Sequence, residues 1–175
     1  MIIHLAAVSN ANISNLYPEY SFENNLVTLK NVLAYIKVNQ AHLIYFSSSM
    51  VYGHFNELEV KETHDLSPLG VYGALKLAAE KLIISYGQVF DFPWTIIRPS
   101  ALYGPRCVSC RVVQNFIESA LRGDVITISG DGKEKIDFTY INDFSAHDKK
   151  IKKSDKTRHN SNFFDELNHA KSYQT

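Results

Sequence analysis

The chain of 175 residues is long enough to bury one hydrophobic core, and 45% hydrophobic residues give it the composition of an ordinary soluble domain. Its 18 basic and 18 acidic residues leave no net charge, so nothing in the charge points to nucleic acid. The sequence has neither an apolar run of membrane-spanning length nor a basic-then-apolar leader, and we therefore expect a cytoplasmic protein without a membrane partner.

Strand and helix patterns alternate along the chain. Apolar residues that recur every three or four positions mark the helices, and short apolar runs bounded by turn residues mark the strands. In chain order the expected elements are a strand that ends at His4, a helix at 24–38, a strand at 42–46, a helix at 69–86, a strand at 94–97, a helix at 108–122 and a strand at 125–128. This order predicts βαβ architecture with a parallel sheet.

One group of residues predicts proton-transfer chemistry. Ser48 follows the second predicted strand, at the strand end where ligands of open α/β sheets bind, and Tyr72 and Lys76 share one face of the second predicted helix. An ammonium at ~4 to 6 Å lowers the pKa of an ionising group such as the phenol by roughly 1 to 3 units. Ser48 can then bridge a substrate oxygen and the Tyr72 phenolate. Ser47 and Ser49 are the alternatives, because a register shift of one residue exchanges their roles with that of Ser48.

The trio of Ser48, Tyr72 and Lys76 lies within an ordered series of motifs. The segments are Ile3-His4-Leu5-Ala6-Ala7, Asn25 with Asn31-Val32-Leu33, Ser47 to Gly53, Pro68 with Tyr72 to Lys76 and Glu80, Arg98 to Arg106, and Gly130 to Asp143. In these segments the chain resembles the NAD-dependent epimerase/dehydratase family, which belongs to the extended short-chain dehydrogenases/reductases. The resemblance implies a partial Rossmann-like, doubly wound parallel sheet that lacks its first strands, in a domain at 1–143. The polar residues 144–175 predict a disordered, irregular tail.

The beginning of the chain departs from the family pattern. Family members open with a strand, a Gly-x-x-Gly-x-x-Gly turn and a helix whose N-terminus holds the cofactor pyrophosphate. None of the eight glycines here forms such a cluster after a strand. If the chain is complete, the phosphate half of the cofactor site is missing. A catalytically inactive, truncated member that acts as a binding or dimerisation module is therefore the alternative to an enzyme.

The resemblance also implies a role for particular residues. Ser48, Tyr72 and Lys76 would be catalytic, and NAD would be the cofactor, with NADP less favoured. The cofactor-binding residues would be Ala6, Ala7, Asn25, Tyr72, Lys76 and Pro99. The substrate-binding residues would be Ser49, Met50, Tyr52, Ala101 and Arg106, where packing in the core is the alternative role for Tyr52.

The residues after Ser48 narrow the reaction. Family dehydratases place an Asp and a Glu there, whereas this chain has Ser49 and Met50, and a thioether transfers no protons. The pattern is closest to the sugar-nucleotide 4-epimerases, which oxidise a sugar carbon transiently and reduce it from the other face. A sugar-nucleotide reductase or dehydrogenase would use the same trio and is an open alternative.

The predicted diphosphate contacts differ from those of many family epimerases. Ala101 and Ile136 stand where these epimerases have an Asn and an Arg that reach the nucleotide diphosphate. Lys133, Lys135 or Arg106 could compensate. A nucleotide sugar is still the expected substrate.

Two further expectations concern metal and partners. Cys107 and Cys110 form a C-x-x-C, but no second pair stands at zinc-finger spacing, so we expect free thiols and no metal. Helices 24–38 and 70–86 are similar to the pair through which the family dimerises by a four-helix bundle, which implies a homodimer.

Overall fold

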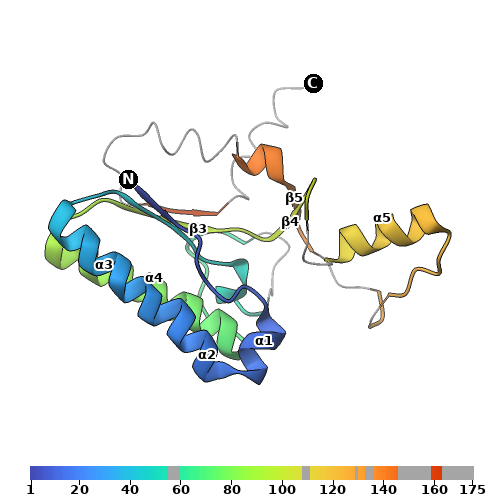
Figure 1. Cartoon of the computed structure of the whole chain (residues 1–175), viewed down its shortest axis with the longest axis horizontal. Coiled ribbons are helices and arrows are strands. Elements are labelled where there is room, and N and C mark those ends of the chain that lie inside the picture. The colour runs from blue at the N-terminus through green and yellow to red at the C-terminus, as the bar shows by residue number, and fades with distance from the viewer. Residues whose placement is uncertain (55–59, 108–110, 129, 133–135, 146–158, 163–175) are drawn as a thin grey trace. The chain divides into compact units, whose positions relative to one another are not determined.

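The computed structural model describes residues 1–54, 60–107, 111–128, 130–132, 136–145 and 159–162, the last four by their backbone (Figure 1). The chain divides into two compact units. Unit 1 contains residues 1–99 and the strand at 159–162, and unit 2 contains residues from 100 to 145.

A parallel sheet forms the centre of unit 1 (Figure 1). Its strands lie in the order β1 (Ile2–His4), β2 (Leu43–Phe46), β3 (Trp94–Arg98) and β6 (His159–Asn162). In the register of the sheet, Ile3 pairs with Ile44 and Ile44 pairs with Thr95. Strands β2 and β3 are buried along almost their whole length, which explains their continuous apolar runs. The parallel sheet and its first three strands confirm the sequence prediction.

Strand β6 lies within the segment 144–175, for which the sequence predicted a disordered tail. Its backbone pairs in parallel with β3, with His159 opposite Thr95 and Asn162 opposite Arg98. The edge of β3 offers N–H and C=O groups that need partners, and any extended backbone can supply them. The sequence His-Asn-Ser-Asn carries no apolar alternation, so no pattern indicated this strand.

Two long helices, α3 (Thr28–Asn39) and α4 (Gly70–Phe90), lie side by side against the sheet of unit 1 (Figure 1). Leu29, Leu33 and Ile36 of α3 pack with Ala79 and Ile83 of α4 in the main core. The core also contains Leu43, Tyr45, Phe92, Trp94 and Ile96. The predicted helix at 69–86 is therefore confirmed, and it continues to Phe90.

The helix predicted at 24–38 has an irregular beginning. Residues Glu23–Val27 form a π-helix, η1, before α3 begins. This wider turn contains Asn25, whose Oδ1 accepts a hydrogen bond from the Val8 backbone N–H at 2.7 Å. The π-helix thus ties the start of this helix to the loop that follows β1.

Two short helices that the sequence did not predict precede η1. These are α1 (Ala11–Leu16) and α2 (Pro18–Phe22). Asn15 of α1 accepts a hydrogen bond at its Oδ1 from the Val71 N–H, at 2.9 Å, and so satisfies one free donor in the first turn of α4. The neighbouring Gly70 has φ +69°, and a Cβ there would lie 3.0 Å from the same oxygen. Both features fix where α4 begins.

Unit 2 contains a pair of short parallel strands, β4 (Ala101–Tyr103) and β5 (Phe138–Tyr140), and the helix α5 (Val112–Arg122). Helix α5 ends at Gly123, with φ +71°, as predicted, while residues 108–110 of the predicted helix lie outside the described residues. The prediction of a strand at 125–128 is wrong. These residues are not in a strand and their side chains are exposed, because no described strand pairs with them.

Candidate active site

Ser48 lies directly beyond the carboxyl end of β2. Backbone hydrogen bonds of its two neighbours, Ser47 and Ser49, hold it to the end of β3. The Ser47 N–H donates to the Ile97 carbonyl at 2.8 Å, and the Ser49 N–H donates to the Pro99 carbonyl at 3.0 Å. The Oγ of Ser48 accepts from the Met50 N–H at 3.2 Å and caps the short 3-10 helix η2 (Ser49–Val51). The turn that carries the three serines is therefore fixed by backbone hydrogen bonds on both sides of Ser48.

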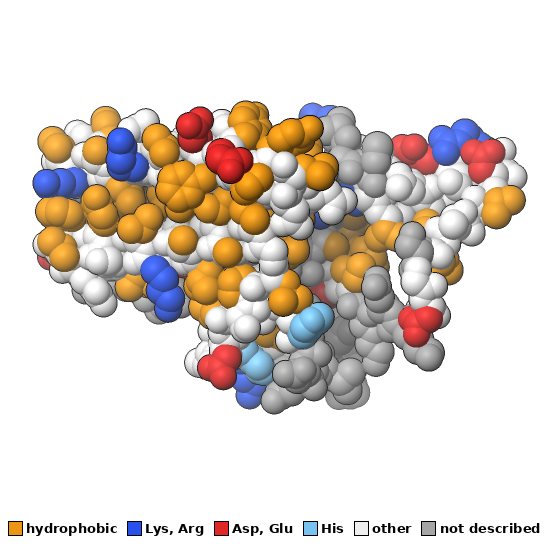
Figure 2. All heavy atoms as spheres, turned by 90° about the horizontal axis from the view of Figure 1, so that it is seen from below, with side chains coloured by type: hydrophobic (Ala, Val, Ile, Leu, Met, Phe, Trp, Pro, Cys, Tyr) orange, Lys and Arg blue, Asp and Glu red, His pale blue; other side chains and the backbone are white. Residues whose placement is uncertain are grey.

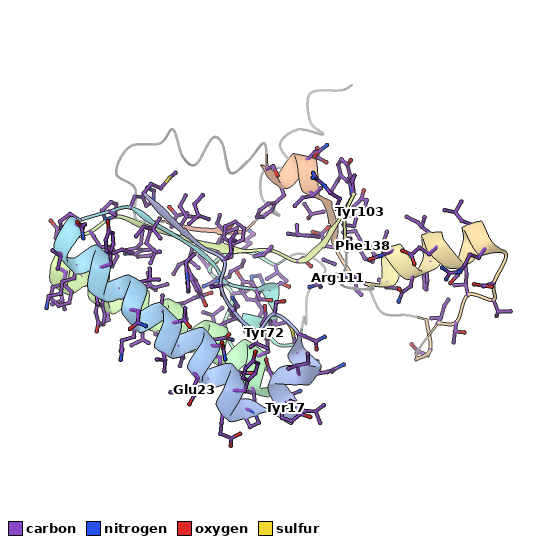
Figure 3. The ribbon with its side chains drawn as sticks, in the orientation of Figure 1. Tyr17, Glu23, Tyr72, Tyr103, Arg111 and Phe138 are labelled. Atoms are coloured by element: carbon purple, nitrogen blue, oxygen red, sulfur yellow. The ribbon has the colours of Figure 1, made fainter. Side chains whose placement is uncertain are left out.

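Tyr72 (Figure 3) and Lys76 lie in the first two turns of α4. Both side chains are buried. The Nζ of Lys76 donates to the Phe46 carbonyl at 2.6 Å. It lies 5.8 Å from the centroid of the Tyr72 ring and 5.0 Å from that of the Tyr45 ring. The last carbonyl of β2 thus fixes the ammonium beside the phenol, and the structure brings Lys76 near Tyr72 as the sequence predicted.

Burial controls the charge of this cluster. Burial lowers the pKa of Lys76 to about 8, although the nearby Glu80 carboxylate acts in the opposite direction. Burial also raises the pKa of Tyr45 far above the ordinary value of a phenol, and the charges of Tyr72 and Glu80 add to this shift. Tyr45 is therefore a neutral wall of the site, and Lys76 can change its charge near neutral pH.

His4 lies at the end of β1, and its ring stacks on Tyr45 with centroids 5.9 Å apart. Burial, and then the charge of Lys76, lower the pKa of His4, so the imidazole is neutral. His4 is buried, and its Nε2 has no hydrogen-bond partner within the described part of the chain. A buried polar atom without a partner next to Lys76 is suited to a polar ligand.

Residues on the predicted cofactor side gather around the loop after β1. Ala6 and Ala7 follow β1, and the Val8 N–H of the same loop donates to Asn25. The amide Nδ2 of Asn25 is buried and finds no acceptor among the residues that the structure describes. Pro99 lies beyond β3, where its carbonyl holds Ser49. This edge of the sheet therefore offers an amide donor that no described residue uses.

An ion pair that the sequence analysis did not identify lies next to the trio. Arg98 donates from Nε and Nη2 to the two carboxylate oxygens of Glu80, at 2.9 and 2.7 Å, and both side chains are at most 2% exposed. Its Nη1 donates to the Tyr52 hydroxyl at 2.7 Å. Tyr52 is buried in this arrangement, as in the packing role that the sequence left open. Glu80 and Arg98 both stand in the family motifs of the sequence, but no pattern there indicated that they pair.

Ala101 and Arg106, the predicted substrate residues of unit 2, line a cavity of about 480 Å³. Tyr103 of β4, Phe138 of β5 and Arg111 just before α5 also line it (Figure 3). Ile136, Cys107, Gln114 and Ile117 complete much of the wall. No sequence pattern indicated Arg111, which directly follows residues 108–110, outside the described residues. The cavity combines aromatic and aliphatic walls with two arginines, as a site for an apolar group attached to an anion would.

The described residues contain no group of three or more His, Cys, Asp or Glu side chains that could hold a metal ion. Cys110 of the C-x-x-C lies outside them. Within the same residues, no helix is long and apolar enough to cross a membrane.

The sequence pattern of the NAD dependent epimerase/dehydratase family matches residues 1–163 of the chain. The chain belongs to this family. Among curated members, an uncharacterized UDP-glucose epimerase of Bacillus subtilis is 36% identical over 146 residues, which are 82% of this chain and 46% of that protein. A putative UDP-glucose 4-epimerase of Methanocaldococcus jannaschii is 33% identical over 148 residues, 82% of this chain and 48% of that protein.

Solved structures of family members have the same fold. The UDP-N-acetylglucosamine 4-epimerase of Methanobrevibacter ruminantium, in complex with UDP-N-acetylmuramic acid, matches with a TM-score of 0.86 and 26% identity over 93% of this chain and 54% of that one. The UDP-glucuronic acid 4-epimerase of Bacillus cereus, in complex with UDP-glucuronic acid and NAD, matches with a TM-score of 0.84 and 29% identity. The match covers 93% of this chain and 53% of that one. The chain therefore spans about half the length of the family members that it matches.

Proposed function

We propose that this chain carries the chemistry of an NAD-dependent sugar-nucleotide 4-epimerase. The observation that supports this proposal is the buried ammonium of Lys76, which lies beside Tyr72 and is bonded to the end of the strand that leads to Ser48. The relatives support the substrate class, because those named above are epimerases of UDP-sugars.

The described residues fit the proposed cofactor. The unpartnered Nδ2 of Asn25 and the loop of Ala6 and Ala7 would bind NAD together with Pro99, Tyr72 and Lys76. Bound there, NAD would supply the site that takes a hydride from a sugar carbon and gives it back on the opposite face. Burial of Lys76 and Tyr72 keeps water from this chemistry.

Each residue of the trio then has one task. The Tyr72 phenolate takes the proton of the sugar hydroxyl, and the Ser48 hydroxyl donates a hydrogen bond that orients the same oxygen. Lys76 as an ammonium stabilises the phenolate. Because the pKa of Lys76 is about 8, the ammonium predominates at pH 7 and is lost as the pH rises past 8. The rate should therefore fall on the alkaline side of that value.

Dehydration does not belong to this proposal. The residues that follow Ser48 are Ser49 and Met50, and neither is the carboxylic acid that water elimination needs. Ser49, Met50 and Tyr52 lie on the sheet edge beside Ser48, and we keep Ser49 and Met50 as substrate contacts. Tyr52 is better explained as a packing residue, because its hydroxyl is bonded to Arg98 in the core.

Taken by itself, the cavity of unit 2 is suited to a nucleotide diphosphate. Arg106 and Arg111 line it, and each can pair with a phosphate oxygen. Ala101 and Ile136 leave apolar wall where many family epimerases have polar residues, so the two arginines would carry the diphosphate contacts. The cytoplasmic location predicted from the sequence is part of the same proposal.

Calorimetry with NAD and a coupled assay with UDP-glucose and UDP-galactose test the proposal. We expect NAD to bind with at least micromolar affinity and Tyr72→Phe to lower turnover by about 100-fold or more, since it removes a general base. Tyr17→Phe, at an exposed tyrosine, is the matched control and should leave turnover unchanged. Net accumulation of NADH would indicate the alternative dehydrogenase, and no detectable NAD binding would sink the enzyme proposal.

A second proposal is self-association through the helices at 24–38 and 70–86. Apolar side chains gather on the face that α3 and α4 form (Figure 2). Exposed apolar residues of the two predicted helices are Val27 at the end of η1, Tyr35 and Val38 of α3, and Leu82 and Val89 of α4. Burying such a face against a second copy would remove it from water. This association requires no catalysis, so it holds equally for an inactive binding module.

Light scattering after size-exclusion chromatography measures this association directly. The parent chain should elute as a dimer, and Tyr35→Glu should give monomers because it places a charge within the apolar face. Val125→Glu, at an exposed site in unit 2, is the control and should stay dimeric. A monomeric parent at concentrations of tens of micromolar would contradict the dimer.

A further inference from the structure

Arg98 is the point where the elements that carry the trio meet. Its guanidinium uses Nε and Nη2 for the carboxylate of Glu80 on α4, and Nη1 for the Tyr52 hydroxyl and the Glu62 carbonyl, the latter at 3.3 Å. The fork geometry of an arginine is what permits three separate segments to be held by one side chain. Arg98 itself is 2% exposed, at the end of β3.

The partners of Arg98 stand at regular distances from the trio. Glu80 follows Lys76 by four residues and Tyr72 by eight on α4, so all three lie on one face of the helix. Tyr52 follows Ser48 by four residues in the turn after β2. One guanidinium therefore links the helix that carries the base to the turn that carries the hydroxyl.

The backbone on either side of Arg98 strengthens this link. The carbonyl of Ile97 accepts from Ser47, and the carbonyl of Pro99 accepts from Ser49. The residues before and after Arg98 thus hold the residues before and after Ser48. Any shift of Arg98 along β3 would move the serine turn with it and would change its separation from α4.

We infer that Arg98 is a positioning residue, which fixes the Ser48 turn against the Tyr72 and Lys76 face of α4 through Glu80 and Tyr52. This role rests on the proposed function, because it matters only where proton transfer needs the trio in one geometry. A displacement of about 1 Å in such a group lowers a rate by about 100-fold. Burial opposes the charge of Arg98, but its hydrogen bonds and the charge of Glu80 outweigh this and raise its pKa, so the guanidinium keeps its charge.

Two variants weaken the link without removing the buried charges. Arg98→Lys keeps the positive charge but loses the fork, and Tyr52→Phe removes only the hydroxyl that Nη1 contacts. Thr95→Val is the matched control. It breaks a partly buried hydrogen bond of 2.9 Å to His42, the residue before β2, and Thr95 lies roughly 10 Å before Arg98 on β3.

Three measurements separate positioning from stability: thermal unfolding, kcat and KM for the sugar nucleotide, and the titration of the Lys76 ammonium by NMR of ¹⁵N-labelled lysine. We expect kcat to fall about 100-fold in Arg98→Lys and about 10-fold in Tyr52→Phe, with KM changed by less than about threefold. The acid dissociation constant of Lys76, with its pKa of about 8, should change at least about twofold in both variants, because the Glu80 carboxylate moves relative to Lys76. Thr95→Val should unfold at a lower temperature but leave kcat, KM and the acid dissociation constant of Lys76 unchanged.

Arg98 is merely structural if both variants behave like Thr95→Val. A parent chain without turnover would refute the proposed function, and the Lys76 titration would then decide about Arg98 by itself. If Arg98→Lys does not fold, Tyr52→Phe carries the same test, since it removes a single oxygen atom. An unchanged titration in folded Tyr52→Phe overturns the inference, and an altered one supports it.

Discussion

The two units of this chain differ in how they hold their polar side chains. In unit 1 the side chains that would perform chemistry are buried, and the hydrogen bonds of Lys76 and Arg98 run to other elements of the fold. In unit 2, by contrast, Arg122 forms its ion pairs with Glu118 and Asp124 at the surface, within or next to its own helix. The proposed proton-transfer centre thus lies on a rigid frame, while the cavity lies on elements with few buried contacts.

Apolar side chains show the same contrast. Helix α3 buries Leu29, Leu33 and Ile36 in the core of unit 1. Helix α5 has a well-formed apolar face, yet it buries none of its side chains within the described structure. Amphipathic sequence alone therefore does not bring stability, because a helix gains free energy only from the surface that it removes from water.

The largest difference should come from the acidic partner of each arginine. Glu80→Ala leaves the Arg98 charge buried without its carboxylate, and we expect it to lower the free energy of unfolding by about 3 to 5 kcal/mol. Glu118→Ala removes an exposed partner of Arg122, for which at most about 1 kcal/mol is expected. Urea unfolding of both variants measures the two values. Equal effects would erase the distinction between the units.

A second effect should appear in the pH dependence of stability. The pKa of Lys76 is about 8 in the folded chain against 10.5 for an ordinary lysine, so between these values the unfolded chain binds more protons. Relative to Lys76→Met, the parent should therefore gain about 1.4 kcal/mol in unfolding free energy for each pH unit from 8 to 10.5. Below pH 8 the difference should be constant. A flat difference across the whole range would show that Lys76 is not desolvated.

The smallest effect should be that of an exposed leucine in α5. Leu121 is 82% exposed, so Leu121→Ala should change the free energy of unfolding by less than about 0.5 kcal/mol. Leu33→Ala is the matched substitution in α3, where the side chain is 1% exposed, and it should destabilise by about 2 to 5 kcal/mol. Thermal unfolding of the pair tests the contrast. A large loss in Leu121→Ala would indicate that α5 is covered by another surface in solution.

The sequence predicted those features that depend on local pattern. Strand β2 was recognisable from its apolar run, and helix α4 from its 3.6-residue period. The positions of Ser48 directly after β2, and of Tyr72 and Lys76 on α4, followed from these two elements. The identity of the family added the expected cofactor and substrate, which no spacing could supply.

Features that depend on distant partners were not predictable in this way. The pairing of Arg98 with Glu80 joins residues of two elements, and each residue taken alone reads as an ordinary charge. Strand propensity gave a wrong prediction at Val125 to Ile128, because a strand also requires a neighbouring strand. Strand β6 shows the converse, in which polar residues become a strand because β3 offers an edge.

The π-helix at Glu23–Val27 has a consequence for how this segment tolerates insertions and deletions. A π-helical turn holds about one residue more than an α-helical one, and each residue turns an α-helix by about 100°. Deleting one codon here would let the helix run regularly and would swing Asn25 away from Val8, while Leu29 and Leu33 could keep their places in the core. One inserted residue is thus enough to let the two parts of one helix present their side chains in independent directions. The first part contacts the loop after β1, and the second part contacts the core.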